Sequence, residues 1–173
     1  MTAYVALLRA VNVGGTGKLP MTELAAMCEK AGFEKVKTYI ASGNVVFTSG
    51  KSEKAVKAAL ERAMEDYAGK AVGVMVRTAR EMAAVRDANP FADAAGNRVV
   101  ATFLDDAPAK DAIEQATNVN GEEMALGTRE IFIRYPEHGM ADSKLKIPGA
   151  KAGTARNMNT VAKLAEMAAK LAC

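Results

Sequence analysis

The hydrophobic pattern of the first 78 residues changes repeatedly between strand and helix periods. Short apolar or β-branched runs at residues 4–8, 36–40, 45–48 and 72–76 predict strands. Between them, apolar residues three or four positions apart predict two helices. Their apolar sides consist of Leu24, Met27, Cys28 and Ala31 in the first helix and Val56, Leu60, Ala63, Met64 and Tyr67 in the second. With Ser42-Gly43 as a hairpin turn, the predicted order is βαββαβ, the split arrangement of a ferredoxin-like unit.

The pattern predicts a second, similar unit after a connecting helix. Thr78 and Glu81 have the spacing of a capping box, and the helix they open would stop at Asn89-Pro90-Phe91. A strand at 98–104, a helix at 108–116, a hairpin at 122–126 and 130–135 and a closing helix follow. The buried side of the closing helix would carry Val161, Leu164, Ala165, Ala168 and Leu171. This order, βαββα, lacks an obvious last strand.

We therefore predict an α+β protein of two ferredoxin-like subdomains, each an alpha-beta plait, packed as one compact unit. The first subdomain would span residues 1–78 and the second, with its C-terminal helix, residues 98–173. Residues 79–97 would form a connecting helix and loop. No repeated residues are visible, so the duplication is one of topology.

The charge is unevenly distributed along the chain. The net charge of +3 over 173 residues is too small to demand a polyanionic partner. Residues 140–173, however, hold six Lys or Arg against two acidic residues, a net +4, which leaves −1 for the rest. Attraction for anions is therefore expected in the last part of the chain.

The chain is poor in residues that bind metals or form disulfides. Its only histidine is His138, interpreted as an exposed turn residue, and its two cysteines, Cys28 and Cys173, are far apart in sequence. We predict reduced thiols, no metal and no cofactor. No run has the length of a signal peptide or membrane span, so we predict a cytoplasmic protein without a membrane partner. The sequence does not set its oligomeric state.

Two familiar motifs are absent or weak. The glycine-rich stretch 14–18 lies between a strand and a helix, but it matches neither the phosphate loop nor the dinucleotide fingerprint and is interpreted as a turn. The predicted central strands lack the aromatic run of an RNA-recognition module, and aromatic residues make up only 5% of the chain. The acidic pairs 105–106 and 122–123 are interpreted as solvated loop ends.

Polar residues on loops are the remaining candidates for a site. Thr154 to Thr160 would open the last helix, where unpaired backbone N–H groups can hold an anion. The full polar set is Arg9, Asn12, Ser42, Asn44, Lys144, Lys146, Arg156, Asn157 and Asn159. Structural alternatives exist: Asn44 as a residue of unusual turn geometry, Asn157 as a helix N-cap and Arg9 as a salt-bridge partner.

Five blocks of this sequence resemble the signature blocks of a bacterial family of unknown function, DUF1697. The blocks are LLRAVNVGG at 7–15, TYIASGNVVF at 38–47, NPF at 89–91, SKL at 143–145 and TARNMNT at 154–160. The resemblance implies a pair of ferredoxin-like subdomains and no established activity. The chain departs from the family pattern at Ala10, where the family usually has glycine, and at Met158, where it usually has tryptophan.

Our leading hypothesis from the sequence is a binding protein for an anionic small ligand, a nucleotide or sugar phosphate. The predicted pocket lies between residues 9–12, 42–44 and 144–159. Arg156 would grip oxygens as a fork and Lys144 would act as a point charge. The ligand contacts would be Arg9, Asn12, Ser42, Asn44, Lys144, Arg156, Asn157 and Asn159. The alternatives are an enzyme using Lys144 or Ser42, weak nucleic-acid binding through the basic tail, and a purely structural role for the motifs.

Overall fold

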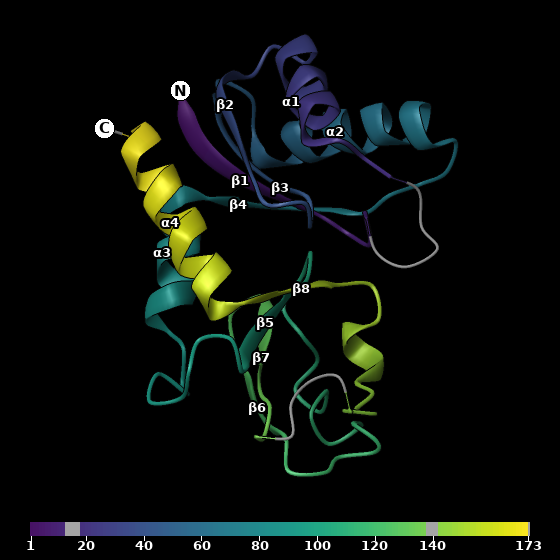
Figure 1. Cartoon of the computed structure of the whole chain (residues 1–173), viewed down its shortest axis with the longest axis vertical. Helices are drawn as coiled ribbons and strands as arrows, with labels where there is room; N and C mark the ends of the chain where they lie inside the picture. The colour runs from purple at the N-terminus through teal and green to yellow at the C-terminus, as the bar shows by residue number, and fades with distance from the viewer. Residues whose placement is uncertain (13–17, 138–141, 173) are drawn as a thin grey trace. The chain divides into compact units, whose positions relative to one another are not determined.

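The computed structural model describes residues 1–12, 18–137 and 142–172 (Figure 1). The chain forms two compact units. The first comprises Met1–Ala83 with Lys163–Cys173, and the second Ala84–Ala162. Each unit contains one four-stranded antiparallel sheet, so the predicted α+β class is confirmed.

The first unit follows the order predicted from the hydrophobic pattern. Its elements are β1 (Thr2–Leu8), α1 (Met21–Lys30), β2 (Glu34–Tyr39), β3 (Asn44–Ser49), α2 (Glu53–Ala68) and β4 (Val74–Thr78). The strands lie in the order β2-β3-β1-β4. Ser52 caps α2 by accepting a hydrogen bond from the Ala55 N–H, and left-handed Gly69 ends the helix.

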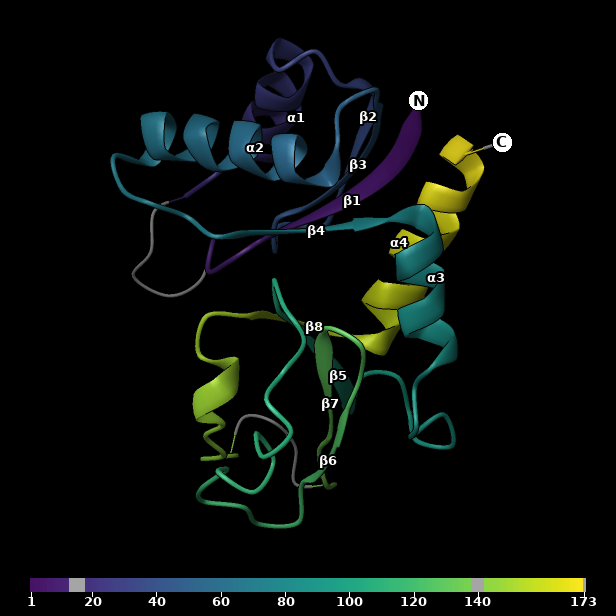
Figure 2. The ribbon, with the colours of Figure 1, turned by 180° about the vertical axis from the view of Figure 1, so that it is seen from behind.

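Helices α1 and α2 cover the same face of the first sheet (Figures 1 and 2). Alternate residues of β1 point into this core, where Phe33 and Phe47 stack with ring centroids 4.3 Å apart. The intervening strand residues are buried as well, among them Val5 and Arg77, which face each other across β1 and β4. Both faces of the sheet are therefore shielded from water at β1, β3 and β4, whereas the edge strand β2 is partly exposed.

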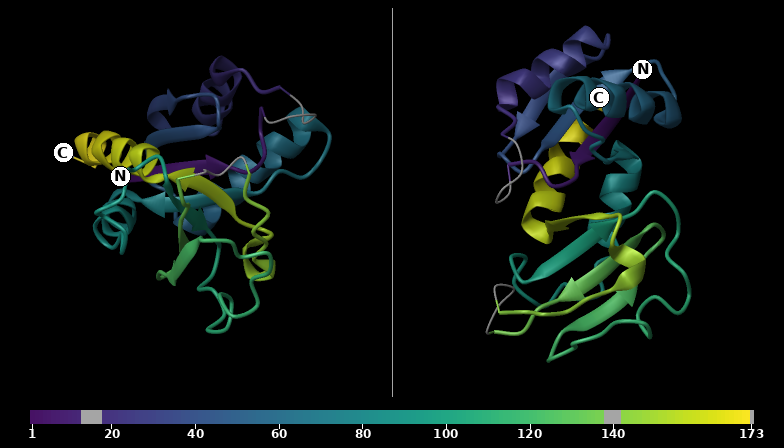
Figure 3. Two further views of the ribbon diagram at one scale, coloured as in Figure 1. Left: turned by 60° about the horizontal axis from the view of Figure 1, so that its bottom comes forward. Right: turned by 90° about the vertical axis from the view of Figure 1, so that its right-hand side faces the viewer.

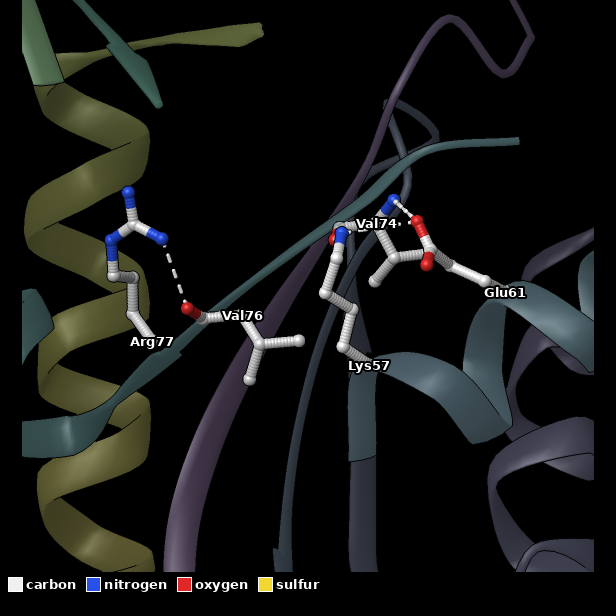
Figure 4. Close-up of polar contacts among 5 residues, drawn as sticks. All are labelled: Lys57, Glu61, Val74, Val76 and Arg77. Atoms are coloured by element: carbon white, nitrogen blue, oxygen red, sulfur yellow. Dashed lines mark hydrogen bonds and ion pairs between the residues drawn. The ribbon is translucent and has the colours of Figure 1, made fainter. Parts of the chain in front are cut away.

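The backbone groups at the outer edge of β4 are bonded to side chains. The Arg9 N–H donates to the Gly73 carbonyl across the β1–β4 ladder. Because backbone groups of successive strand residues point to opposite sides, those of Val74, which follows Gly73, point away from β1. Lys57 donates to the Val74 carbonyl at 2.6 Å, and Glu61 accepts from the Val74 N–H at 3.2 Å (Figure 4). Two residues further on, Arg77 donates to the Val76 carbonyl at 3.0 Å.

Helix α3 (Ala79–Asp87) follows β4 directly and begins with the predicted capping box. Thr78 Oγ1 accepts from the Glu81 N–H at 3.1 Å, and Glu81 Oε1 accepts from the Thr78 N–H at 2.9 Å. Beyond the helix, Asn89 Oδ1 accepts from the Phe91 N–H, the geometry of an Asx turn. The capping box and the end of the helix before Asn89 were therefore predicted correctly.

The second unit has the same strand connectivity as the first. Its elements are β5 (Val99–Phe103), β6 (Glu123–Leu126), β7 (Glu130–Arg134), the 3₁₀ turn η1 (Pro148–Ala150), β8 (Thr154–Asn157) and the first residues of α4 (Met158–Ala172). The strand order is β6-β7-β5-β8. In both sheets the first strand lies between the third and the fourth, and the second strand forms an edge.

Two predictions for the second unit are wrong. Residues 108–116 form hydrogen-bonded turns and no helix, because Ala112 is the only buried residue between 108 and 116 and no apolar stripe anchors one. The last strand, thought to be missing, is β8, which pairs with β5. Residues 154–157 therefore belong to a strand, and the last helix begins at Met158.

Candidate functional site

The Asn12 side chain links two loops of the first unit by hydrogen bonds. Its Nδ2 donates to the Leu19 and Ala41 carbonyls, both at 2.8 Å, and its Oδ1 accepts from the Leu19 N–H at 2.6 Å. Both amide hydrogens and the carbonyl are used, so this side chain joins the ends of the loop after β1 and ties it to the β2–β3 turn. Its left-handed φ of 56° is one that asparagine tolerates well.

Ser42 and Asn44 meet in the same turn. Asn44 is fully buried at the start of β3, and its Nδ2 donates to the Tyr39 carbonyl and to Ser42 Oγ, both at 2.9 Å. Its interpretation as a residue of unusual turn geometry is wrong, because the residues of this turn with a positive φ are Ile40 and Gly43, and Asn44 is not among them. Arg9 lies exposed at the end of β1, and its backbone N–H bonds to Gly73. The structure thus brings Asn12, Ser42 and Asn44 together around one turn.

Ala10 adopts a left-handed φ of 55°, a conformation that glycine adopts without strain and that a Cβ opposes. We expect Ala10→Gly to raise the free energy of unfolding by about 1 kcal/mol, because it removes the clash of a Cβ in this region. Urea unfolding measures the change. Ala3→Gly, in the extended strand β1, is the matched control and should lower stability. A loss of stability in Ala10→Gly would contradict this explanation.

Arg156 lies on β8, buried with 7% of its surface exposed. Its Nη1 donates to Thr154 Oγ1 at 2.7 Å and to the Ala155 carbonyl at 2.9 Å. Burial lowers the pKa of the guanidinium to about 10, so it stays charged at neutral pH. Its predicted position at a helix N-terminus is wrong, because the strand continues through Asn157.

The N-terminus of α4 is partly satisfied by the chain itself. Asn157 Oδ1 accepts from the Thr160 N–H at 2.9 Å, so the N-cap alternative for Asn157 is confirmed, and the Met158 N–H donates to the Gly96 carbonyl. Met158 is buried. The exposed Asn159 side chain lies against Gly96, so a Cβ at residue 96 would require the Asn159 side chain to move. Two of the N–H groups considered for an anion are therefore already bonded.

Lys144 and Lys146 belong to a strap, residues 142–153, that passes along the second sheet on its way to β8 (Figure 3). The strap is fixed at two points. Thr117 and Lys146 exchange backbone hydrogen bonds at 2.8 and 3.0 Å. Ser143 Oγ donates to Glu122 Oε2 at 2.5 Å, and Glu122 is buried. The interpretation of Glu122 as a solvated loop end is therefore wrong.

A cavity of about 620 Å³ lies between the strap and one face of the second sheet. The sheet contributes Thr102, Ile133 and Ala155, and the strap Leu145, Lys146, Ile147, Pro148, Ala150, Lys151 and Gly153, with Tyr135 beside them. Gly153 allows the close approach of strap and sheet, because a Cβ there would lie 2.6 Å from the Phe103 carbonyl oxygen. Most of the lining residues are apolar, and two of the others are lysines.

Tyr135 adds a hydroxyl group to this cavity. Burial, and secondly the charge of Glu122, raise the pKa of its phenol above the ordinary value. At neutral pH the phenol is protonated and can donate a hydrogen bond. The side chains of Tyr135, Lys146 and Lys151 thus each give the cavity lining a hydrogen-bond donor.

A second hollow, of about 590 Å³, lies between α1 and α2 in the first unit. Its charged lining residues are of both signs, namely Lys30, Lys51 and Arg62 with Glu23 and Asp66. The ionisable side chains of the cavity in the second unit, in contrast, are two lysines and a neutral tyrosine. The second unit therefore offers the better complement to an anion.

Arg77 is a buried polar residue that the sequence analysis missed. It is 1% exposed, and in β4 it occupies the place that Arg156 occupies in β8. Each arginine donates to the carbonyl of the preceding residue, and each lies one residue before the side chain that caps the next helix. The two units thus share a residue-level feature, whereas the sequence suggested only a shared topology.

Three sequence interpretations fall partly or wholly outside the described residues. These are the glycine-rich stretch at 14–18, His138 and Cys173. Cys28 is free and buried in the core of the first unit. Burial, and secondly Glu29, raise the pKa of its thiol to about 12, which makes it a poor nucleophile at neutral pH. Among the described residues, no helix is long and apolar enough to cross a membrane.

Two four-stranded antiparallel sheets, with four helices in the described part of the chain, define an α+β protein. The chain belongs to the family described as "Protein of unknown function (DUF1697)", whose profile matches residues 1–132. The resemblance seen in the signature blocks is thereby confirmed.

The structure is also similar to a solved structure, that of the conserved bacterial protein SP0830 from Streptococcus pneumoniae. The TM-score is 0.80 and the sequence identity 26%, over 96% of this chain and 98% of the other. A search of curated proteins found no match.

Proposed function

We propose that this protein is a cytosolic binding protein for a small anionic ligand, held in the cavity between the strap and the second sheet. The observation that carries the proposal is the pair of lysines, Lys146 and Lys151, in the wall of a mostly apolar cavity. Its volume, about 620 Å³, is within the usual range for small-molecule sites.

The lining residues support a division of roles. Lys146 and Lys151, both exposed in the strap, act as point charges on a phosphate or carboxylate. The Tyr135 hydroxyl donates a hydrogen bond to the same oxyanion or to the body of the ligand. Because its backbone is paired with Thr117, Lys146 presents its charge from a fixed point of the wall.

The proposal keeps the ligand class predicted from the sequence and moves its main contacts to the strap. Lys144 lies in the strap, and Arg156 and Asn157 lie on β8 beside the sheet wall. The predicted ligand contacts through Arg9, Asn12, Ser42, Asn44, Lys144, Arg156, Asn157 and Asn159 stay predictions.

We also propose that both units follow the ferredoxin-like plan. The order βαββαβ of the first unit and the strand order β2-β3-β1-β4 support this assignment. The second unit repeats the strand order with turns in place of its first helix.

The test is a thermal-shift and titration panel on the whole protein. The ligands are inorganic phosphate, nucleoside monophosphates, ribose 5-phosphate, glucose 6-phosphate and a ten-nucleotide DNA strand. At least one anion should raise the melting temperature, since a ligand that binds only the folded state stabilises it. Lys146→Ala with Lys151→Ala should weaken that ligand about 10-fold or more, by loss of charge-assisted hydrogen bonds.

Lys110→Ala is the matched control, because Lys110 is an exposed lysine of the second unit outside the cavity. It should bind like the wild type. No shift with any small anion up to millimolar concentration would refute the proposal. Binding of the oligonucleotide alone, with a steep salt dependence, would instead favour the nucleic-acid alternative.

A further inference from the structure

We infer that the side of α1 and α2 turned away from the first sheet is a contact surface for a second copy of this chain, related to the first by a two-fold axis (Figure 2). The surface contains the hollow of about 590 Å³ between the two helices. The inference is independent of the anion site proposed for the second unit. It follows from the apolar floor of the hollow and from the order of the charges around it.

The floor of the hollow is apolar and accessible to solvent. Met27, Ala31 and Ala59 pack against the core of the first unit, yet each remains partly exposed. Ala63 also lines the floor, and Tyr67 lies at the rim with 45% of its surface exposed. A second protein surface would remove this apolar area from water, which favours a protein partner here.

The two helices run in opposite directions over the sheet. Helix α1 connects β1 to β2 and α2 connects β3 to β4, and β1 and β2 point one way while β3 and β4 point the other. Lys51, just before α2, donates its ammonium group to the carbonyl of Ala31, just after α1, at 3.4 Å. The end of α1 therefore lies beside the start of α2.

This arrangement separates the charges of the hollow by sign. Lys30, in the last turn of α1, and Lys51 lie at one end. Glu23, in the first turn of α1, and Asp66, in the last turn of α2, lie at the other. The hollow thus has a basic end and an acidic end.

Most of these charges are available to a partner. Within the described part of the chain, four of the charged side chains of the hollow form no ion pair: Glu23, Lys30, Arg62 and Asp66. Separated charges around an apolar surface are neutralised by a partner with the opposite order of charges.

A second copy has that opposite order by symmetry. In a two-fold interface both copies use the same surface. An axis that crosses the helices places the acidic end of each copy opposite the basic end of the other. Glu23 then faces Lys30 of the other copy, and Asp66 faces its Lys51. An axis parallel to the helices would bring like charges together, which is unfavourable.

The side chains of the hollow suit such a contact. Ala26, Ala59 and Ala63 lie near the middle and allow the helices of the two copies to approach closely. Tyr67, at the acidic end, enters the hollow of the other copy at its basic end, where the ring contacts the ammonium group of Lys51. Tyrosine is among the residues that contribute most to the affinity of protein interfaces. The two rings therefore fill the two hollows.

Sedimentation equilibrium of the whole protein over a range of concentrations measures the association. Helix α2 has 16 residues and α1 only 10, so the surface lies at the lower end of the size range of specific interfaces. We expect a dimer with a dissociation constant of about 10–100 µM at low salt. Added salt should weaken it, because the pairs lie at the rim.

Charge reversal tests the pairing. Glu23→Lys and Lys30→Glu each turn an attractive pair into a repulsive one, and the two-fold axis repeats the change. Each variant should raise the dissociation constant about 10-fold or more. The double variant has opposite charges again and should dimerise within about 3-fold of the wild type. An equimolar mixture of the two single variants should form heterodimers with similar affinity.

Tyr67→Ala tests the aromatic contact and should also raise the dissociation constant about 10-fold or more. The matched controls are Glu29→Lys and Lys54→Glu, at exposed charges of α1 and α2 outside the hollow. Both should dimerise like the wild type. Thermal unfolding followed by circular dichroism shows whether each variant folds.

The double variant separates pairing from an effect on α1 alone. Glu23 and Lys30 also complement the dipole of α1, so each reversal disfavours the helix, and the double variant disfavours it most. A purely helical role would therefore make the double variant the worst, whereas pairing between copies restores its dimer.

Three results would overturn the inference. The first is a protein that stays monomeric up to about 1 mM. The second is a dimer that both single reversals leave unchanged, since it would form through another surface. The third is a loss of the dimer in the single variants without recovery in the double variant or the mixture. None of these results bears on anion binding, which is measured with Lys146→Ala and Lys151→Ala.

Discussion

Replacing Gly43 by alanine is expected to lower the free energy of unfolding by about 2–4 kcal/mol, because two costs add at this turn. The residue has a φ of 88°, which a side chain opposes, and a Cβ there would lie 2.5 Å from Val11 Cγ2 and 3.1 Å from Leu8 Cβ. The turn cannot easily move away, since the Gly43 carbonyl accepts the Leu8 N–H at 2.9 Å. Urea unfolding of the variant measures the loss.

Gly69→Ala is the matched control for this change. Gly69 has a similar φ of 73°, but nothing lies within 4 Å of a Cβ built on it. Its replacement should therefore cost only the backbone strain, about 1 kcal/mol. Equal losses in the two variants would show that the contact with Val11 and Leu8 does not matter, and the explanation for glycine in this signature block would then rest on φ alone.

Replacing Arg77 by alanine is expected to lower the free energy of unfolding by about 2–4 kcal/mol, through a cavity and a lost hydrogen bond. The side chain is 1% exposed, so its whole aliphatic stem is packed. It also donates to the Val76 carbonyl at 3.0 Å, and this acceptor loses its partner in the variant. Chemical unfolding followed by circular dichroism measures the change.

Two further variants separate the causes. Arg77→Met keeps most of the buried volume and removes the donor, so it should recover part of the loss. Arg80→Ala removes an exposed arginine three residues away and should change stability by no more than about 0.5 kcal/mol. If Arg77→Ala costs no more than Arg80→Ala, the packing of the Arg77 stem contributes nothing to stability.

The first unit was predictable because its signals are local. The apolar runs of β1 and β3, the Ser52 cap and the Gly69 stop each lie within a few residues of the element they define. Periodicity then assigns one face of each helix to the core. The capping box at Thr78 and Glu81 was recognisable for the same reason, since both hydrogen bonds join residues three apart.

The second unit was less predictable because its structure depends on distant pairing. Strand β8 has only four residues and no run of apolar side chains, and it exists through its ladder with β5, some fifty residues earlier. Conversely, residues 108–116 had a helix-like composition but only Ala112 to anchor them.

The candidate site shows the same limit. The sequence analysis selected Asn12, Ser42, Asn44 and Asn157 as candidate site residues. In the structure, each of these four side chains forms a hydrogen bond within the chain. The cavity could not be foreseen, because the Thr117–Lys146 bridge and the Ser143–Glu122 bond fix the strap through contacts that no local pattern reveals. Arg77 ends an apolar run, and only the sheet register shows that it faces Val5.

The hydrogen bonds at the outer edge of β4 also affect whether a strand of another chain can pair with this sheet. A strand at the margin of a sheet is normally a template on which a strand of another chain can add. Here the Val74 N–H and carbonyl and the Val76 carbonyl are already bonded to Glu61, Lys57 and Arg77. An incoming strand would have to displace three charged side chains before forming its own ladder. The fold thus protects this margin against intermolecular sheet extension, and with it against one common route to aggregation.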